Sequence, residues 1–297
     1  MAIQWNLPPL RPSGPLDADV EARRTAMNAA IMAADPLHPE LPHIARKEAK
    51  IGITTCWEVG DAASAGTIVM YLHGGGFALG DPKMWRRYAA RIAQDAGVFL
   101  ALVKYRLAPE NPFPSAVHDV VSAYQELCER FPDKKIVVMG ESAGASLTAT
   151  LAVAALQNGA RLPDALILIS PLLDLRVEHS AYDSHAALDT MVSRESNSMI
   201  RRNYLQGHPE TDPLASPVLG DLGKFPPVQF HCGGNEVLIG DATDFVSKMA
   251  LAGGLVESHF VPGAGHGWTF TQPQSDAAKY TMGHILRYLR ELPAKLN

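Results

Sequence analysis

Short apolar segments alternate with helical patterns along most of the chain, and this alternation constrains the fold more than any other feature. Thr67–Leu72, Val98–Val103, Lys135–Met139 and Ala165–Ile169 have the length and apolar content of buried strands. Helical patterns separate them, such as Ser115–Arg130, in which apolar residues recur every three or four positions. Strands that alternate with helices of this length indicate βαβ units and a parallel sheet.

The rest of the chain follows the same alternation, except for a polar, helix-prone stretch at Asp174–Glu210, which indicates an insertion. We predict a further strand over Ile51–Val59, ahead of the first βαβ unit. Asp81 is the expected N-cap of a helix over Lys83–Gln94, with Pro82 at its first position. The other expected elements are helices Val20–Ala34, Ala143–Leu156, Ser193–Gln206, Asp241–Ala252 and Gln274–Leu292, and strands Val228–Cys232 and Val256–Val261.

The chain of 297 residues is long enough for one large α/β domain or for two domains. We expect one catalytic α/β domain in two parts, residues 51–175 and residues 211–297. Residues 1–50 are expected to form an N-terminal arm, and residues 176–210 a cap insertion. Together, the arm and the insertion are expected to cover the catalytic domain.

Composition excludes several classes of protein. Hydrophobic residues make up 47% of the chain and charged residues 19%, a globular mixture that excludes a disordered chain, a coiled coil and a collagen-like fibre. Lys and Arg number 26 against 31 Asp and Glu, and the net charge of -5 argues against nucleic-acid binding, which needs a basic face. The most apolar stretches fall short of the ~18–20 residues that a membrane span needs.

The expected compartment is the cytoplasm. Met1–Pro12 is rich in proline and lacks the basic start and apolar run of a signal peptide. Cys56, Cys128 and Cys232 are odd in number and far apart, so we expect free thiols rather than a disulfide framework or a structural zinc site.

The sequence Gly140–Gly144 (GESAG) has the GxSxG pattern and lies between a predicted strand and a predicted helix. Its small residues allow a sharp strand-to-helix turn that leaves the Ser142 hydroxyl exposed at the start of the helix. There the helix dipole favours negative charge on a substrate oxygen. Ser142 is therefore the predicted nucleophile, and the alternative is a serine that merely caps the helix.

His73–Gly76 (HGGG) directly follows the predicted strand Thr67–Leu72. Three successive glycines leave backbone N–H groups unobstructed, so that they can point at one acceptor, such as the oxyanion of an acyl-transfer reaction. The amide of Ala143, directly after the nucleophile, is the expected further donor. A phosphate-binding loop is the alternative, but the lysine and Ser/Thr of a P-loop are missing at the required spacing.

His266 is the predicted general base. It lies in the glycine-lined loop Pro262–Trp268, directly after the last predicted strand, at the edge of the sheet where sites collect. A third residue must orient the imidazole and stabilise its cation. We expect it in the loop after strand Val228–Cys232, where Glu236 and Asp241 are the two candidates.

Four motifs together resemble those of the hormone-sensitive-lipase-type (HGGG/GxSxG) carboxylesterases of the α/β-hydrolase superfamily. They are HGGG at His73–Gly76, YRLAPE at Tyr105–Glu110, GESAG at Gly140–Gly144 and DPLASP at Asp212–Pro217. The resemblance extends from about Ile51 to Leu292 and keeps the family's order and spacing. It implies a mostly parallel, eight-stranded sheet flanked by helices, a helical cap built from the arm and the insertion, and ester hydrolysis without a cofactor or a metal.

The resemblance also assigns residues. By the family's pattern, the oxyanion donors fall on Gly75, Gly76 and Ala143. The family places an aspartate two residues before a leucine in the loop after the strand, and Glu236 stands there in this chain. Glutamate is one methylene longer, but its carboxylate can serve if the loop backs off slightly. The rival, Asp241, is expected to cap the following helix.

These features predict a serine carboxylesterase acting on short- to medium-chain uncharged esters through an acyl-enzyme intermediate. A lactone hydrolase with the same triad is the nearest alternative, and a hydrolase-fold receptor for a small molecule is the alternative outside enzymes. We expect a homodimer through the exposed edge of Val256–Val261, and an internal ion pair between Arg106 and Glu110. Candidates for the acyl pocket, of which we expect no more than half to line it, are Trp5, Met27, Met32, Phe77, Leu79, Trp85, Met191, Tyr204, Leu205 and Trp268.

Overall fold

Eight strands form one sheet in this computed structural model, which describes residues 4–12, 14 and 18–292. The strands are β1 (Arg46–Ile51), β2 (Thr54–Val59), β3 (Thr67–Leu72), β4 (Phe99–Lys104), β5 (Lys135–Glu141), β6 (Ala165–Ile169), β7 (Val228–Gly233) and β8 (Val256–Val261). Their spatial order is β1-β2-β4-β3-β5-β6-β7-β8. β2 pairs antiparallel with β1 and with β4, and all other neighbours pair parallel, which confirms the expected sheet.

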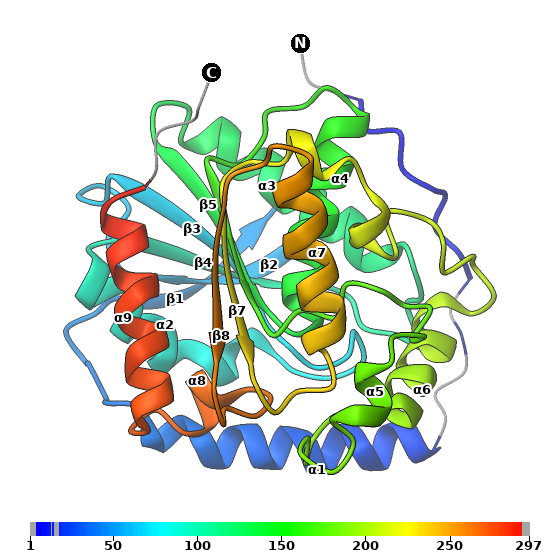
Figure 1. Cartoon of the computed structure of the whole chain (residues 1–297). Helices are drawn as coiled ribbons and strands as arrows, with labels where there is room; N and C mark the ends of the chain where they lie inside the picture. The colour runs from blue at the N-terminus through cyan, green and yellow to red at the C-terminus, as the bar shows by residue number, and fades with distance from the viewer. Residues whose placement is uncertain (1–3, 13, 15–17, 293–297) are drawn as a thin grey trace.

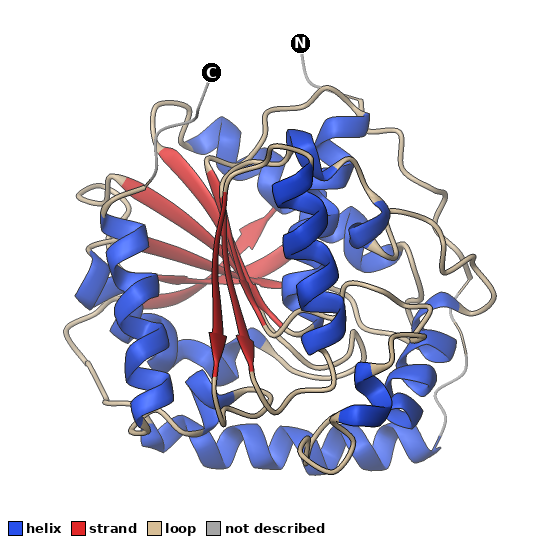
Figure 2. Cartoon of the chain, in the orientation of Figure 1, coloured by secondary structure: helices blue, strands red, loops and turns tan. Residues whose placement is uncertain are grey.

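Helices cover both faces of the sheet (Figure 2). The α-helices are α1 (Ala18–Ala34), α2 (Arg86–Ala96), α3 (Ser115–Arg130), α4 (Ala143–Gln157), α5 (Ala181–Ser184), α6 (Arg194–Leu205), α7 (Ile239–Leu251), α8 (Trp268–Thr271) and α9 (Asp276–Arg290). Short 3-10 helices are η1 (Asp35–Leu37), η2 (Pro82–Trp85), η3 (Pro217–Leu219) and η4 (Leu222–Lys224). None of the helices in the described ranges has both the length and the hydropathy to cross a membrane.

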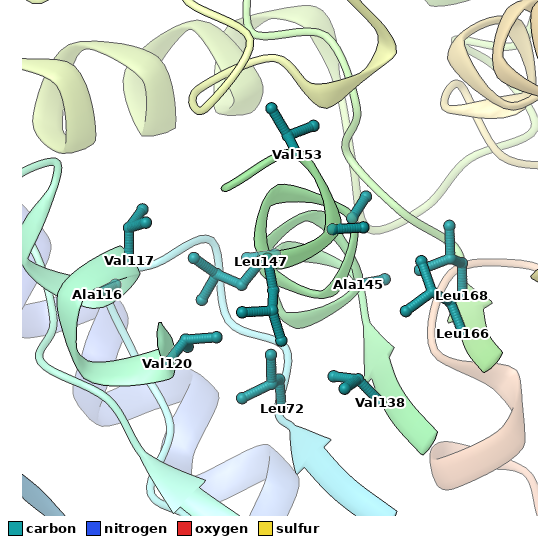
Figure 3. Packing of buried hydrophobic residues seen from close by; sticks show 14 of the residues in the cluster. Leu72, Ala116, Val117, Val120, Val138, Ala145, Leu147, Val153, Leu166 and Leu168 are labelled. Atoms are coloured by element: carbon teal, nitrogen blue, oxygen red, sulfur yellow. The ribbon is translucent and has the colours of Figure 1, made fainter. Parts of the chain in front are cut away.

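The central strands are buried on both faces, which explains their continuous apolar sequences. In β3, Met70 and Leu72 face the cluster under α3, α4 and α7, whereas Val69 and Tyr71 face the cluster under α2 and α9. Leu147 of α4 is almost completely buried in the first of these clusters. Figure 3 shows part of that cluster, including Leu72, Val117, Val120, Val138, Leu147, Leu166 and Leu168.

The structure divides the predicted strand Ile51–Val59 into two. Gly52 turns the chain with a φ of 52°, and β1 and β2 form an antiparallel hairpin on either side of it. The prediction missed β1 because Arg46–Lys50 is mainly charged and lies at the edge of the sheet, where most of its side chains are partly or fully exposed. Edge strands tolerate such charges because they do not enter the core.

The expected helix over Lys83–Gln94 also has two parts, η2 and α2. Asp81 is its N-cap as predicted, because its carboxylate accepts a hydrogen bond of 3.0 Å from the amide of Lys83. Gly97 ends α2 in the left-handed conformation, with a φ of 67°.

Helix α1 crosses the molecule at the carboxyl ends of the strands, with α5 and α6 close to one of its ends (Figure 1). The loops that follow parallel strands meet at this edge, where α/β proteins place their sites. Residues far apart in the sequence, namely those of α1, of residues 191–203 and of the loops after β3, β5 and β8, therefore come together there.

We expect Leu147→Ala to lower the free energy of unfolding by about 2–5 kcal/mol, because it removes buried methyl groups and leaves a cavity under α4. Chemical denaturation measures this change. Leu251→Ala is the matched control, since Leu251 is 89% exposed and its loss should change stability by no more than about 0.5 kcal/mol. Equal effects of the two substitutions would contradict this account of the core.

Candidate active site

Ser142 lies in a tight turn between β5 and α4. Its backbone has φ 54° and ψ -123°, a positive φ that residues other than glycine adopt rarely. A Cβ atom on Gly140 would lie 2.4 Å from the Gly144 carbonyl, and one on Gly144 would lie 2.0 Å from the Leu72 carbonyl oxygen. Both positions therefore require glycine, as the sequence predicted for a sharp strand-to-helix turn.

The structure brings Ser142, His266 and Glu236 into one hydrogen-bonded chain. His266 Nε2 lies 3.0 Å from Ser142 Oγ, and His266 Nδ1 lies 2.7 Å from Glu236 Oε2. Glu236 is completely buried, and its Oε1 accepts hydrogen bonds from the Ser170 hydroxyl at 2.7 Å and from the Gly233 amide at 2.6 Å. These donors fix the carboxylate, which in turn orients the imidazole.

Asp241 does not take either of the positions considered for it. In the described part of the chain it makes no bond to His266, and α7 begins two residues before it, at Ile239, without a side-chain cap. Burial and the neighbouring charge of Asp174 raise the pKa of Asp241 well above its ordinary value. The expectation that Asp241 caps the helix is therefore wrong.

Charge at the site is governed by burial and by Glu236. Burial alone would lower the pKa of His266, but the hydrogen bond and the charge of Glu236 outweigh it, so that the pKa of His266 is raised. An imidazole in this setting holds an accepted proton more readily than one in water. The arrangement suits a base that must carry a positive charge for part of a reaction.

A second buried carboxylate, Glu141, lies beside this chain. It lines the same cavity as Ser142 and His266, and its Oε2 has no hydrogen-bond partner among the described residues. Burial raises its pKa to about 7, the charge of Glu236 adds to the increase, and that of His266 opposes it. Glu141 therefore changes its charge close to neutral pH.

The glycine loop after β3 faces the serine. A Cβ on Gly74 would lie 3.3 Å from Ser142 Cβ. Gly75 and Gly76 have φ values of 123° and 58°, and in the described residues neither amide donates a hydrogen bond. Ala143 is the first residue of α4, so its amide has no acceptor within the helix. All three predicted oxyanion donors therefore have amides available to a ligand.

His73, the first residue of the HGGG motif, packs against buried aromatic side chains. It is buried, its ring stacks on those of Tyr105 and Trp85 at 4.4 and 5.1 Å, and its carbonyl accepts a hydrogen bond from the Tyr105 hydroxyl. Burial lowers the pKa of His73 to about 4, so its imidazole is neutral at neutral pH. This setting is that of a structural histidine.

Ion pairs around the YRLAPE segment differ from the expected one. Arg106 pairs with Asp119 of α3 at 2.8 Å, and Glu110 pairs with Arg24 of α1 at 2.7 Å. The predicted pair between Arg106 and Glu110 is therefore wrong. Each residue finds its partner on an element that only the folded chain brings close.

An apolar cavity of about 450 Å³ leads to Ser142 and His266. Of the ten candidates for its lining, Met27, Leu79, Trp85 and Met191 line it, whereas Trp5, Met32, Phe77, Tyr204, Leu205 and Trp268 do not. Other lining residues, which the sequence did not indicate, come from one face of α1, from α6 and from two core loops, and include Val20, Ala30, Ile31, Leu172, Met199, Ile200 and Leu238. The helical spacing of the α1 residues was visible in the sequence, but not what that face covers.

One group of side chains in the described residues has the composition of a metal site, and it lies outside this cavity. Glu257 and His259 of β8 and His284 of α9 bring their ligand atoms within 4.8 Å of one another. Glu257 Oε1 already accepts hydrogen bonds from Gln229, His259 and Arg287. These donors account for the cluster as an internal network.

The pH dependence of stability should report on Glu141. The pKa of Glu141 is about 7 in the folded chain, against an ordinary 4.5. The stability that the protonated carboxyl group contributes is therefore complete below about pH 4.5 and is lost as the pH rises through about 7. The Glu141→Gln variant cannot ionise. We therefore expect its free energy of unfolding, relative to wild type, to increase between about pH 5 and about pH 8.

Denaturant titrations at several pH values measure this difference. Glu195→Gln is the control, since Glu195 is an exposed glutamate of α6 outside the cavity. The difference between control and wild type should stay constant over the same range. Parallel pH curves for wild type and Glu141→Gln would contradict the assigned ionisation.

Known proteins resemble this chain in both sequence and fold. A family model described as alpha/beta hydrolase fold matches residues 69–270. An acetyl-hydrolase of Streptomyces hygroscopicus is 34% identical over 224 residues, 75% of each chain. An esterase of Acinetobacter venetianus is 30% identical over 226 residues, 75% of this chain and 74% of the relative.

Solved structures agree with these relatives. A hormone-sensitive lipase from a metagenome library superposes with a TM-score of 0.85 and 27% identity, covering 94% of this chain and 93% of that one. An esterase from the bacterial hormone-sensitive lipase family gives the same TM-score and coverage at 28% identity. The chain belongs to the hormone-sensitive-lipase-type carboxylesterases of the α/β-hydrolase superfamily.

Proposed function

We propose that this carboxylic ester hydrolase forms an acyl-enzyme on Ser142 and acts on short- to medium-chain uncharged esters. One observation carries the proposal, namely the chain of hydrogen bonds from Glu236 through His266 to Ser142 at the floor of an apolar cavity. A serine hydroxyl needs an adjacent base to become a nucleophile, and a base needs a third group to orient it.

In the proposed mechanism, Ser142 Oγ attacks the ester carbonyl carbon while His266 Nε2 takes the hydroxyl proton. Glu236 stabilises the imidazolium that results. The tetrahedral intermediate then expels the alcohol, which receives the proton from His266. In the second half, His266 takes a proton from water, the hydroxide attacks the acyl carbon, and Ser142 leaves with that proton as the acid departs.

In both halves of the reaction, negative charge develops on the carbonyl oxygen and must be stabilised. We propose that the amides of Gly75, Gly76 and Ala143 stabilise this charge, in agreement with the free state of the first two. Removal of one such donor from a serine protease costs about 2.7–4 kcal/mol. Glycines at these positions leave the approach to the amides open.

The proposed substrate class follows from the cavity. Its volume of about 450 Å³ is at the lower end for ligand sites, and most of its lining is apolar. We propose that the arm of residues 1–50 and the insertion of residues 176–210 form its cap, because α1 and α6 both contribute lining residues. An apolar cavity of this size favours compact esters over long acyl chains.

We also propose that the enzyme is cytoplasmic and dimeric. Cys56, Cys128 and Cys232 are free thiols, which agrees with a reducing compartment. Among the described residues β8 pairs with β7 alone, and we propose that its outer edge pairs with a second chain. The mass in solution, measured by light scattering, tests whether the protein is a dimer.

Substitution of the acid tests the triad. We expect Glu236→Gln to lower kcat by roughly 10⁴-fold, because the amide supports the wrong imidazole tautomer. Asp241→Asn is the matched control and should keep most of the activity. The Ser142→Ala variant gives the background rate, since it should neither turn over a chromogenic ester nor react with an organophosphate. Ester turnover retained by Ser142→Ala would overturn the proposed nucleophile.

Substrate size is the second test. Along a series of p-nitrophenyl esters from acetate through butyrate and octanoate to palmitate, we expect kcat/KM to fall by about tenfold or more for palmitate. Met191→Ala, which widens the cavity, should shift the preference to longer chains. A higher kcat/KM for alicyclic lactones than for these linear esters would instead favour the lactone hydrolase.

A further inference from the structure

Helix α1 forms hydrogen bonds with the glycine loop that follows β3, although the two are far apart in the sequence. Arg24 Nε donates a hydrogen bond of 2.8 Å to the carbonyl of Ala78. One helical turn later, Asn28 Oδ1 accepts a hydrogen bond of 3.2 Å from the amide of Gly80. The helix therefore holds the segment that follows the glycines at two points, Ala78 and Gly80.

The same guanidinium reaches a second loop. Arg24 donates to the carbonyl of Ala108 at 3.1 Å and makes a two-pronged pair with Glu110, at 2.7 and 2.9 Å. The two loops are also joined to each other, because the amide of Ala108 donates to the carbonyl of Phe77 at 2.8 Å. Arginine can join several acceptors in this way because its guanidinium carries five donors in a rigid plane, whereas lysine has no such fork.

The turn held by Arg24 carries two of the three proposed oxyanion donors, Gly75 and Gly76. The carbonyl of Gly75 accepts hydrogen bonds of 3.0 Å from the amides of Ala78 and Leu79. A movement of Ala78 therefore moves Gly75, and with it the peptide plane that carries the Gly76 amide. Glycine peptides rotate easily, so their direction must be set by contacts from outside the loop.

We propose that Arg24, assisted by Asn28, is a positioning residue that presets the oxyanion amides for the transition state. The proposal rests on the proposed function, because it assigns Arg24 to the same acyl transfer. Other side chains of α1, such as Val20, Met27 and Ile31, line the substrate cavity. One helix thus contributes both to substrate enclosure and to stabilisation of the oxyanion.

The test compares Arg24→Met with Arg24→Lys and with Thr25→Ala, an exposed neighbour on α1 that is absent from the cavity lining. We expect Arg24→Met to lower kcat by about 10- to 100-fold with little change in KM, since misplacement of a reacting group by about 1 Å costs up to that factor. Arg24→Lys keeps the charge but not the planar fork, and should recover only part of kcat. Thr25→Ala should match wild type.

A pair of inhibitors separates positioning from general damage. An alkyl trifluoromethyl ketone forms an oxyanion with the serine, whereas the matching alcohol only fills the cavity. Arg24→Met should lower the affinity for the ketone by about the same factor as kcat, and should leave the affinity for the alcohol unchanged. If wild type itself does not bind the ketone, the proposed function fails rather than the role of Arg24.

Two results would overturn the positioning role. The first is a raised KM with unchanged kcat in Arg24→Met, which would limit Arg24 to substrate entry. The second is an equal loss of affinity for ketone and alcohol. Should Arg24→Met not fold, Asn28→Ala removes only the bond to Gly80, and it must show the same selective weakening of the ketone, to a smaller degree, for the proposal to stand.

Discussion

The close approach of α4 to β3 is the constraint on which the site depends. Gly144 lies so near the carbonyl of Leu72 that no side chain fits between them. Because β3 and β5 are neighbours in the sheet, this contact brings the glycine loop after β3 against the turn after β5. The packing of one helix on one strand thereby sets the distance between the nucleophile and the proposed oxyanion donors.

Burial gives this arrangement its chemistry. Glu236 is cut off from water, and its charge is balanced by two hydrogen-bond donors and by the imidazole of His266. Low solvent access strengthens each of these interactions relative to water. The same environment raises the pKa of Glu141 to about 7, so that the site holds a second carboxyl group whose charge depends on pH.

The sequence predicted those parts of the fold that local patterns determine. Apolar strands such as Thr67–Leu72 and Ala165–Ile169 have the predicted bounds, because burial on both faces leaves an unbroken apolar segment. Ser142 and His266 were predicted from short glycine-containing motifs, and the glycines around Ser142 are required by the backbone shape of its turn. Glu236 was predicted from the family's pattern in the loop after β7, with Asp241 as the alternative.

Other features depend on contacts between distant elements and left no local signal. β1 is charged and lies at the edge of the sheet, so it lacks an apolar pattern. Arg24, Arg106, Asp119 and Glu110 were visible as charges, but their pairing is decided by which elements the fold brings together. The cavity lining likewise depends on where α1 lies, and not on its own periodicity.

The position of α1 has a consequence for the newly made chain. This helix leaves the ribosome before its partners, since the partners of Arg24 lie 54 to 86 residues later. Arg11, ahead of the helix, bonds to the carbonyls of Leu205 and Gln206, which are translated later still. Arg11 therefore cannot dock until residues 194 and 195 positions later have been synthesised, and the centre that joins Ser142 to His266 cannot be complete before His266 has been made.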